Sequence, residues 1–257
     1  MTERLIPNWR ILAAGLSFVA FGIGGVLLRI IVFPFLYLLI WSRKRRILLA
    51  RSMIRLIFRF YIGLMGFMGV LRYEIQGLDK LNRGSLLILA NHPTLLDTVF
   101  LMAFVKRADC IVKANLLNNP FTRGPVRAAG YINNEHGHDL VADCIASLRC
   151  GNNLIVFPEG TRTPIDGVIS MKRGAANIAV RGRCNMTPVV IRCSSAILGK
   201  GQKWWQVPKS PVRFEIQVQE DIAIHDFIAN DIAETRAARH LTEYLQQYFT
   251  RKYHDHV

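Results

Sequence analysis

His92 and Asp97 are the two residues of this chain whose types and spacing best suit acid–base chemistry. They lie in residues 91–97, with the sequence Asn-His-Pro-Thr-Leu-Leu-Asp. A histidine can take a proton from a hydroxyl near neutral pH, and a carboxylate bonded to one ring nitrogen fixes the tautomer and leaves the other nitrogen free. The alternative is a histidine that caps a helix, with Asp97 as an ordinary surface carboxylate. The pair alone does not decide between these two interpretations.

A second segment, residues 157–162, adds a carboxylate and a guanidinium. Its sequence is Phe-Pro-Glu-Gly-Thr-Arg, so Glu159 and Arg162 flank a glycine-containing turn. Arginine stays charged at any working pH and makes bidentate bonds to phosphate. We therefore expect Arg162 and Glu159 to face the same crevice as His92 and to help bind an anionic substrate. A structural ion pair between Glu159 and Arg162 is the competing interpretation.

The elements around these segments predict an α/β fold with a largely parallel sheet flanked by helices. The apolar run 86–90 is typical of a buried strand, and 153–157 is another. Pro93 suits the first turn of a helix over 94–104, which would put Asp97 on its second turn. Both segments would then lie at strand ends, where open α/β sheets bind ligands. Further strands are predicted over 71–76, 109–113, 188–191 and 212–218, and further helices over 138–149, 172–181 and 231–251.

In these motifs the chain resembles the glycerolipid acyltransferases, the family of the 1-acylglycerol-3-phosphate acyltransferases. Residues 91–97 look like the family's His-X4-Asp motif, and residues 157–162 look like its Phe-Pro-Glu-Gly-Thr-Arg motif. Residues 171–175, Met-Lys-Arg-Gly-Ala, are similar to the basic Lys-Gly-Ala segment that follows, and residues 187–191 resemble its Val-Pro-Val strand. The four matches come in the family's order.

The resemblance implies an O-acyltransferase. It would move an acyl group from a thioester, acyl-CoA or acyl-carrier protein, to a hydroxyl of a glycerophospholipid-like acceptor. His92 would be the general base and Asp97 its partner, in a direct transfer; the chain has no Gly-X-Ser-X-Gly elbow such as hydrolases use. No metal and no bound cofactor are expected. The residues expected to bind substrate are Glu159, Gly160, Thr161, Arg162, Lys172 and Arg173.

Two places differ from the family's pattern. Pro93 and Thr94 stand where the family usually has Gln-Ser. In residues 130–136, Glu135 and His136 fall near the positions where many members have Asp-Arg, whose arginine helps to hold the acceptor phosphate. Because a carboxylate is unfavourable beside a phosphate, this second difference leaves the acceptor open between lysophosphatidic acid and another lipid-like alcohol.

Residues 1–70 predict a membrane-anchoring and interfacial helical region in front of a catalytic domain over 71–257. Residues 11–28 are uncharged and mostly apolar, and the apolar character resumes after Arg29, so the stretch is long enough to cross a bilayer. Arg29 and Pro34 leave open whether it spans the membrane or dips in and returns to the same face.

The charge distribution also favours a membrane. Residues 1–60 hold ten Lys or Arg and one acid, and so carry +9 of the net charge of +15. Basic residues beside apolar segments suit an anionic lipid surface, whereas a nucleic-acid-binding protein would present a basic patch on a recognisable module, and none is found. Residues 51–70 are expected to form an interfacial helix whose basic stripe consists of Arg51, Arg55 and Arg59.

These patterns predict a location at the cytoplasmic (inner) membrane, with the catalytic domain facing the cytoplasm, because the basic block 43–46 favours the cytoplasmic side. Membrane lipids are the expected partners, and no nucleic acid is expected. Acyl carrier protein is a further candidate, which could meet Arg181, Arg183, Lys200 and Lys203; the alternative is that these side chains are solvated surface. The alternative function is a catalytically silent membrane scaffold with an acyltransferase fold.

Overall fold

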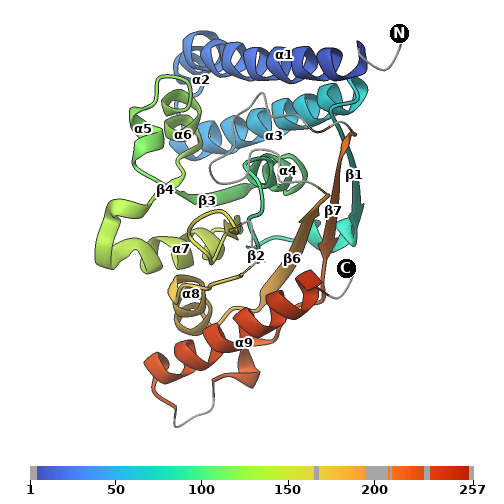
Figure 1. Cartoon of the computed structure of the whole chain (residues 1–257). Helices are drawn as coiled ribbons and strands as arrows, with labels where there is room; N and C mark the ends of the chain where they lie inside the picture. The colour runs from blue at the N-terminus through green and yellow to red at the C-terminus, as the bar shows by residue number, and fades with distance from the viewer. Residues whose placement is uncertain (1–4, 165–167, 195–207, 209, 229–231, 255–257) are drawn as a thin grey trace.

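A mostly parallel sheet forms the centre of the molecule (Figure 1). The computed structural model describes residues 5–164, 168–194, 208, 210–228 and 232–254. Within these residues seven strands pair in the order β1-β7-β6-β2-β5-β3-β4, and only β6 and β7 are antiparallel. The predicted fold class is confirmed. The strands are β1 (Leu71–Gln76), β2 (Leu87–Ala90), β3 (Ala108–Val112), β4 (Ile132–Asn133), β5 (Asn153–Val156), β6 (Met186–Cys193) and β7 (Val212–Val218).

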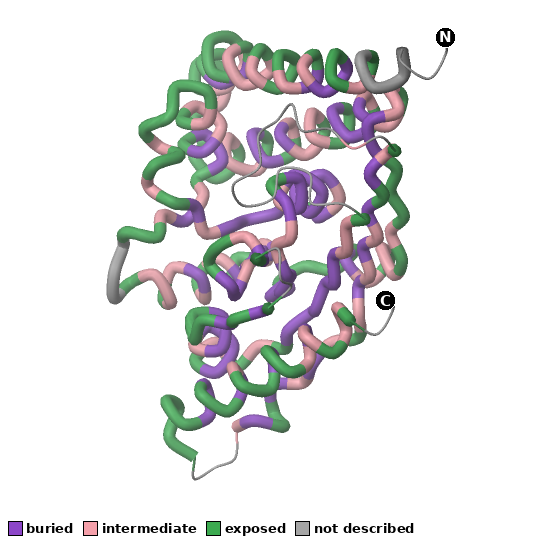
Figure 2. The backbone as a smooth tube through the Cα atoms, viewed as in Figure 1, coloured by how far each residue is buried: buried purple, intermediate pink, exposed green. Residues whose placement is uncertain are grey.

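Helices cover both faces of this sheet, and the alternation of strand side chains explains why. In β2, Ile88 and Ala90 join the core cluster that contains α3 and α4, whereas Leu87 and Leu89 join the cluster that contains α7, α8 and α9. A strand that is buried on both faces must be apolar throughout, as the central strand β2 is, whereas Figure 2 shows the edge strand β1 as largely exposed. The helices are α3 (Arg43–Phe67), α4 (Leu96–Phe104), α7 (Leu140–Arg149), α8 (Gly174–Gly182) and α9 (Glu234–His254).

The amino-terminal apolar segment is one helical stretch with a widened turn in its middle. It consists of α1 (Leu5–Leu27), a π-helical turn (Leu28–Val32) and α2 (Phe33–Leu39), and α1 lies along α3 (Figure 1). Pro34 has no amide hydrogen to donate to the preceding turn, and the π turn lies where that bond is lost. Among the described residues, Trp9–Leu39 is the one helical stretch long and apolar enough to cross a membrane, with a mean hydropathy of 2.3.

Helix α3 belongs to the main core as well as to the amino-terminal region. Its residues Tyr61, Ile62 and Met65 pack in the same cluster as β2 and α4. The functional division at residue 70 therefore stays a prediction, because packing does not separate α3 from the rest of the domain.

The prediction that Arg51 belongs to an exposed basic stripe on α3 is wrong, because Arg51 is only 6% exposed. Its Nη2 lies 2.7 Å from Asp109 Oδ2, and its Nε donates to the carbonyl of Ala129. A buried guanidinium needs such partners, since an unpaired buried charge is strongly unfavourable. Arg51 therefore fastens α3 to β3 and to the end of α6 (Arg123–Ala129), instead of facing a membrane. Arg59 is exposed and Arg55 is half-buried.

The remaining described elements are short. The segment 130–136, whose sequence differs from the expected pattern, follows α6 and contains the short strand β4, which pairs with β3. Glu135 is exposed, and the side chain of His136 lies outside the described residues. The other short elements are α5 (Asn115–Asn118) and the 3-10 turns Leu78–Leu81, Asn134–Asp139 and Ile224–Asp226.

Candidate active site

His92 and Asp97 meet at the carboxyl end of β2, as their spacing predicts. The Nδ1 atom of His92 lies 2.9 Å from Oδ2 of Asp97. The His92 side chain is 16% exposed, whereas that of Asp97 is fully buried. No hydrogen bond to Nε2 of His92 is formed within the described part of the chain. The ring is thus held through one nitrogen, and the other nitrogen remains available for a proton.

Thr94 completes the bonding of the Asp97 carboxylate. Its amide donates to Oδ2 at 2.6 Å, and its hydroxyl donates to Oδ1 at 2.6 Å. Burial raises the pKa of Asp97 above its usual value, while the hydrogen bonds from His92 and Thr94 act to lower it. Thr94 was not among the expected site residues, although the Thr-X-X-Asp spacing before an apolar helix is a known pattern of helix starts and could have identified it.

The helix that carries Asp97 begins later than expected. α4 starts at Leu96, so Pro93 precedes the helix and Asp97 lies on its first turn. The prediction of a helix from residue 94 with Asp97 on the second turn was wrong because the bonds between Thr94 and Asp97 hold a separate turn ahead of the helix. A carboxylate in a first turn is also favoured by the helix dipole.

Asn91 anchors the histidine to the sheet. Its side-chain nitrogen donates to the carbonyl of Ile191, and its side-chain oxygen accepts from the amide of Ile191, both at 2.7 Å. The buried amide of Asn91 therefore continues the pairing of β2 with β6 for one more residue. His92 follows directly after this pairing ends, so the position of its backbone is fixed by the sheet.

The segment 157–163 holds His92 from the other side. Glu159 Oε1 accepts from the amide of His92 at 2.9 Å, and the amide of Thr163 donates to the carbonyl of His92 at 2.7 Å. The ring of Phe157 stacks on the imidazole, with centroids 4.2 Å apart and an angle of 25° between the planes. Sequence reasoning placed Glu159 beside His92 correctly but missed Phe157 and Thr163 as its contacts.

Glu159 is 3% exposed, and its described contacts are within the protein. The same atom, Oε1, also accepts from the hydroxyl of Thr163 at 2.8 Å. Burial raises the pKa of Glu159, and the bonds from Thr163 and His92 oppose this rise. These contacts hold the backbone of His92, and they differ from the ion pair with Arg162 that was the competing interpretation.

The hydrogen bonds of Glu159 lead to a prediction that distinguishes two roles for its side chain: positioning the backbone of His92, and supplying a negative charge. In Glu159→Gln the carbonyl oxygen can accept both bonds of Oε1, so we expect kcat within a few-fold of wild type. Because the pKa of Glu159 is raised by burial, its ionisation at neutral pH contributes unfavourably to folding, so the melting temperature of Glu159→Gln should not fall. Glu159→Ala should leave the amide of His92 without its partner, which costs roughly 1–3 kcal/mol, and should lower kcat by about 100-fold.

Steady-state kinetics and thermal unfolding of the two variants check this prediction. Equal loss of activity in Glu159→Gln and Glu159→Ala would show that the negative charge itself is required, as for a residue that binds substrate through its charge.

Gly160 and Lys172 pack against each other on the turn. Gly160 has φ +66°, and a Cβ there would lie 3.0 Å from Nζ of Lys172. The amide of Lys172 donates to the carbonyl of Pro158 at 2.8 Å. The positive φ favours glycine at this position, and the absence of a side chain leaves room for the end of Lys172.

The other expected substrate-binding residues lie nearby in sequence but are less defined by contacts. Thr161 and Arg173 are exposed, and Arg162 is half-buried. Arg173 lies at the start of α8. Of the residues expected to meet acyl carrier protein, Arg181 lies 3.6 Å from Glu234, and Lys200 and Lys203 lie outside the described residues.

Comparisons with known proteins find similar acyltransferases. Residues 72–192 match the family described as Acyltransferase, a region that contains every expected site residue. A 1-acyl-sn-glycerol-3-phosphate acyltransferase of Pseudomonas aeruginosa is 26% identical over 176 residues, which are 65% of this chain and 65% of that protein. A putative 1-acyl-sn-glycerol-3-phosphate acyltransferase of Caenorhabditis elegans is 29% identical over 169 residues, or 62% of this chain and 58% of that protein. The matches thus span less than two thirds of either relative.

A solved structure shows the same fold over nearly the whole chain. The crystal structure of PlsC from Thermotoga maritima, a 1-acyl-sn-glycerophosphate (LPA) acyltransferase, superposes with a TM-score of 0.73 at 20% identity. The similarity covers 96% of this chain and 97% of that one, so it includes the amino-terminal helices.

Proposed function

We propose that this chain is an O-acyltransferase of the 1-acylglycerol-3-phosphate acyltransferase type, because residues 72–192 match the Acyltransferase family model and both similar proteins carry that name. The observation that carries the proposal is the 2.9 Å contact between His92 Nδ1 and the fully buried Asp97. This contact orients the imidazole and leaves Nε2 for chemistry, an arrangement suited to a general base.

The proposed reaction is a direct transfer in one site. Nε2 of His92 takes the proton of the acceptor hydroxyl as its oxygen attacks the carbonyl carbon of the thioester. The tetrahedral intermediate then collapses, the carbon–sulfur bond breaks, and the thiolate leaves with the proton that His92 had taken. Asp97 keeps Nδ1 protonated and stabilises the positive charge that the imidazole carries between the two steps.

The expected substrate-binding residues take two roles in this proposal. Glu159 acts through His92, whose amide it binds, and Gly160 admits Lys172 against the turn. Arg162, Lys172 and Arg173 supply positive charge for an anionic group of a substrate, with Thr161 as a hydroxyl donor beside them. A bidentate arginine contact suits a phosphate in particular.

The proposed acceptor is a lysophosphatidic-acid-like lipid, supported by the names of the two curated relatives. The proposed donor is acyl-CoA or acyl-carrier protein. The exposed apolar residues of α1 support attachment to a membrane, for which we propose the cytoplasmic membrane with the catalytic domain facing the cytoplasm.

Product analysis tests the proposal. The purified full chain, in detergent, is mixed with lysophosphatidate and either acyl-CoA or acyl-carrier protein, and the lipids are measured by mass spectrometry. We expect phosphatidate with at least one of the donors. Formation of another acylated lipid, when other lysolipids and lipid alcohols are supplied, would correct the acceptor. Absence of any transfer would leave the membrane scaffold as the function.

A further inference from the structure

Two adjoining cavities lie between the end of the amino-terminal helix, the start of α3, and α6. One has a volume of about 110 Å³ and is lined by residues that include Tyr37, Arg43 and Arg46. The other is more open, has a volume of about 550 Å³ and includes Arg29 and Pro34 in its lining. The cavities share Phe33, Tyr37, Arg127 and Ala128. Neither cavity contains a residue of the candidate active site.

The lining carries positive charge without a neutralising group. Arg29, Arg43, Arg46 and Arg127 are the charged residues that line the two cavities, and no acidic residue lines either one in the part of the chain that the structure describes. The first turn of α3 also contains no acidic residue, and its exposed amides add the positive end of the helix dipole. The cavities therefore suit an anion.

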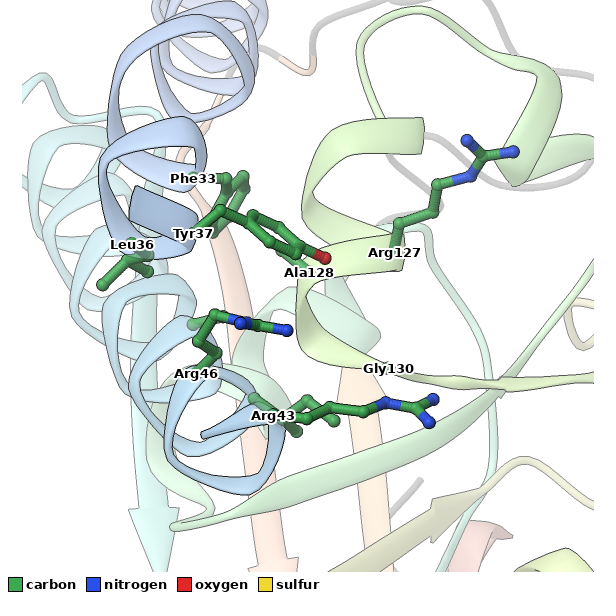
Figure 3. A pocket seen from close by; sticks show the side chains of 10 residues that line it. Phe33, Leu36, Tyr37, Arg43, Arg46, Arg127, Ala128 and Gly130 are labelled. Carbon is green, nitrogen blue, oxygen red and sulfur yellow. The ribbon is translucent and has the colours of Figure 1, made fainter. Parts of the chain in front are cut away.

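Several donors of these arginines are unused. The guanidinium groups of Arg43 and Arg127 have no hydrogen bond or ion pair within the described residues. Arg46 donates only through Nη1, to the carbonyls of Ile40 and Trp41, and lies 4.5 Å from the centre of the Tyr37 ring. A guanidinium carries five N–H donors, so Arg46 keeps donors for a ligand while its position is fixed. Figure 3 shows Arg43 and Arg46 extending from α3 in the direction of Gly130, with the Tyr37 hydroxyl above them.

The surface beside the cavities is apolar. Phe35, Leu38 and Leu39 of α2 are each at least 60% exposed, and Trp41, just before α3, is 92% exposed. These residues belong to or directly follow the helical stretch that can enter a membrane. An exposed tryptophan next to arginines is typical of a protein surface at the level of lipid headgroups. An anion that carries acyl chains therefore matches both the basic cavities and the apolar surface beside them.

Close packing keeps the two walls of this site together. A Cβ at Gly124 of α6 would lie 2.7 Å from Cβ of Arg29, and a Cβ at Gly130 would lie 3.1 Å from Ile47 of α3. Leu28, Phe33 and Ala50 form a buried cluster with Ala128 and Ala129 underneath. The arginines are thus held on a preformed frame, which lowers the entropic cost of binding.

We propose that these cavities bind the phosphodiester headgroup of an anionic membrane phospholipid through Arg43, Arg46, Arg127 and Tyr37, with its acyl chains along α2. The bound lipid is structural and not a substrate. It fixes the depth and orientation of the chain at the bilayer, independently of the chemistry at His92.

A pair of double variants tests the site with matched loss of charge. Arg43→Gln/Arg127→Gln removes two positive charges that line the cavities. Lys44→Gln/Arg45→Gln removes two positive charges that directly follow Arg43 in the sequence but do not line the cavities. Binding of the full chain to phosphatidylcholine vesicles, with and without phosphatidylglycerol, is measured by co-sedimentation.

General attraction to the anionic surface is weakened equally in both variants. The first variant also loses charge-assisted hydrogen bonds in the cavity, so we expect its binding to phosphatidylglycerol vesicles to be roughly 10-fold weaker than that of the second. Equal binding of the two variants would overturn the site.

Two further arms separate the sources of the anion. Short-chain phosphatidylglycerol should displace the protein from vesicles far more effectively than inorganic phosphate; equal competition would indicate a site for free anions and would contradict the lipid proposal. In zwitterionic micelles, the KM for lysophosphatidate should be unchanged in Arg43→Gln/Arg127→Gln. A raised KM would show that the cavities bind the acceptor, and the proposal of a separate lipid site would then be wrong.

Discussion

Replacement of His92 by alanine is expected to lower kcat for acyl transfer by roughly 100- to 10,000-fold, the usual contribution of a positioned general base. In His92, Nδ1 is bound to Asp97, so Nε2 is the ring nitrogen that can take the proton of the acceptor. The expected effect is on kcat, because the imidazole takes the proton only as the new bond forms. Initial rates with a saturating thioester donor measure it.

His92→Asn is the matched variant for this experiment. Its side-chain NH2 can replace Nδ1 as the donor to Asp97, but it has no basic nitrogen. We expect His92→Asn to be as inactive as His92→Ala, while both variants keep the fold and bind vesicles as wild type does. Activity in His92→Asn close to that of wild type would contradict the assignment of the base.

Replacement of Asp97 by asparagine should lower kcat/KM by roughly 100- to 10,000-fold without loss of stability. The asparagine oxygen can accept from Nδ1 of His92 and the amide of Thr94, and its NH2 can donate to the Thr94 hydroxyl. The geometry is therefore kept, but the carboxylate that stabilises the imidazolium is lost. Kinetics over a range of pH and thermal unfolding of the same preparation provide the two readouts.

The sign of the stability effect follows from the pKa of Asp97, which burial raises. A carboxyl whose folded-state pKa lies above its unfolded value contributes stability at pH below the unfolded value, about 3.9, and this contribution is lost as the pH rises through the folded-state pKa. At neutral pH the ionised group is thus unfavourable for folding. Asp97→Asn should then unfold at the same or a higher temperature than wild type, and a fall of both stability and activity would point to a structural role.

The sheet and the reacting pair were predictable because local signals agreed with the fold. The six strands expected from apolar runs are present, with bounds that differ by at most two residues. His92 was placed correctly because an apolar strand ends directly before it, and parallel strands bring their carboxyl ends together. Glu159 reached His92 for the same reason, since β5 pairs with β2.

Other features depend on contacts between distant segments and could not be read from periodicity. Arg51 looks like part of a surface stripe in sequence, and only the position of Asp109 on β3 shows that it is buried. The start of α4 depends on side-chain bonds of Thr94 that compete with the helix. The role of Thr163 depends on the turn that brings its amide to the carbonyl of His92.

The structure also relates the two halves of the chain. α3 packs in the same core cluster as β2 and α4. It begins at the basic cavities beside the apolar amino-terminal helix (Figure 1). Arg51 ties the same helix to β3. A lipid bound at the start of α3 would therefore act on a helix that is rigidly joined to the catalytic domain.

If His92 activates an acceptor hydroxyl for direct attack on the thioester, no acyl group is ever attached to the protein. Intact-protein mass spectrometry in a single turnover tests this most directly, with a stoichiometric acyl thioester added first and lysophosphatidate second. We expect the mass of the wild-type chain to stay unchanged before the acceptor is added, and free thiol and acylated lipid then to appear together, but not with His92→Ala. A chain heavier by one acyl group before the acceptor is added, and converted to product afterwards, would contradict direct attack.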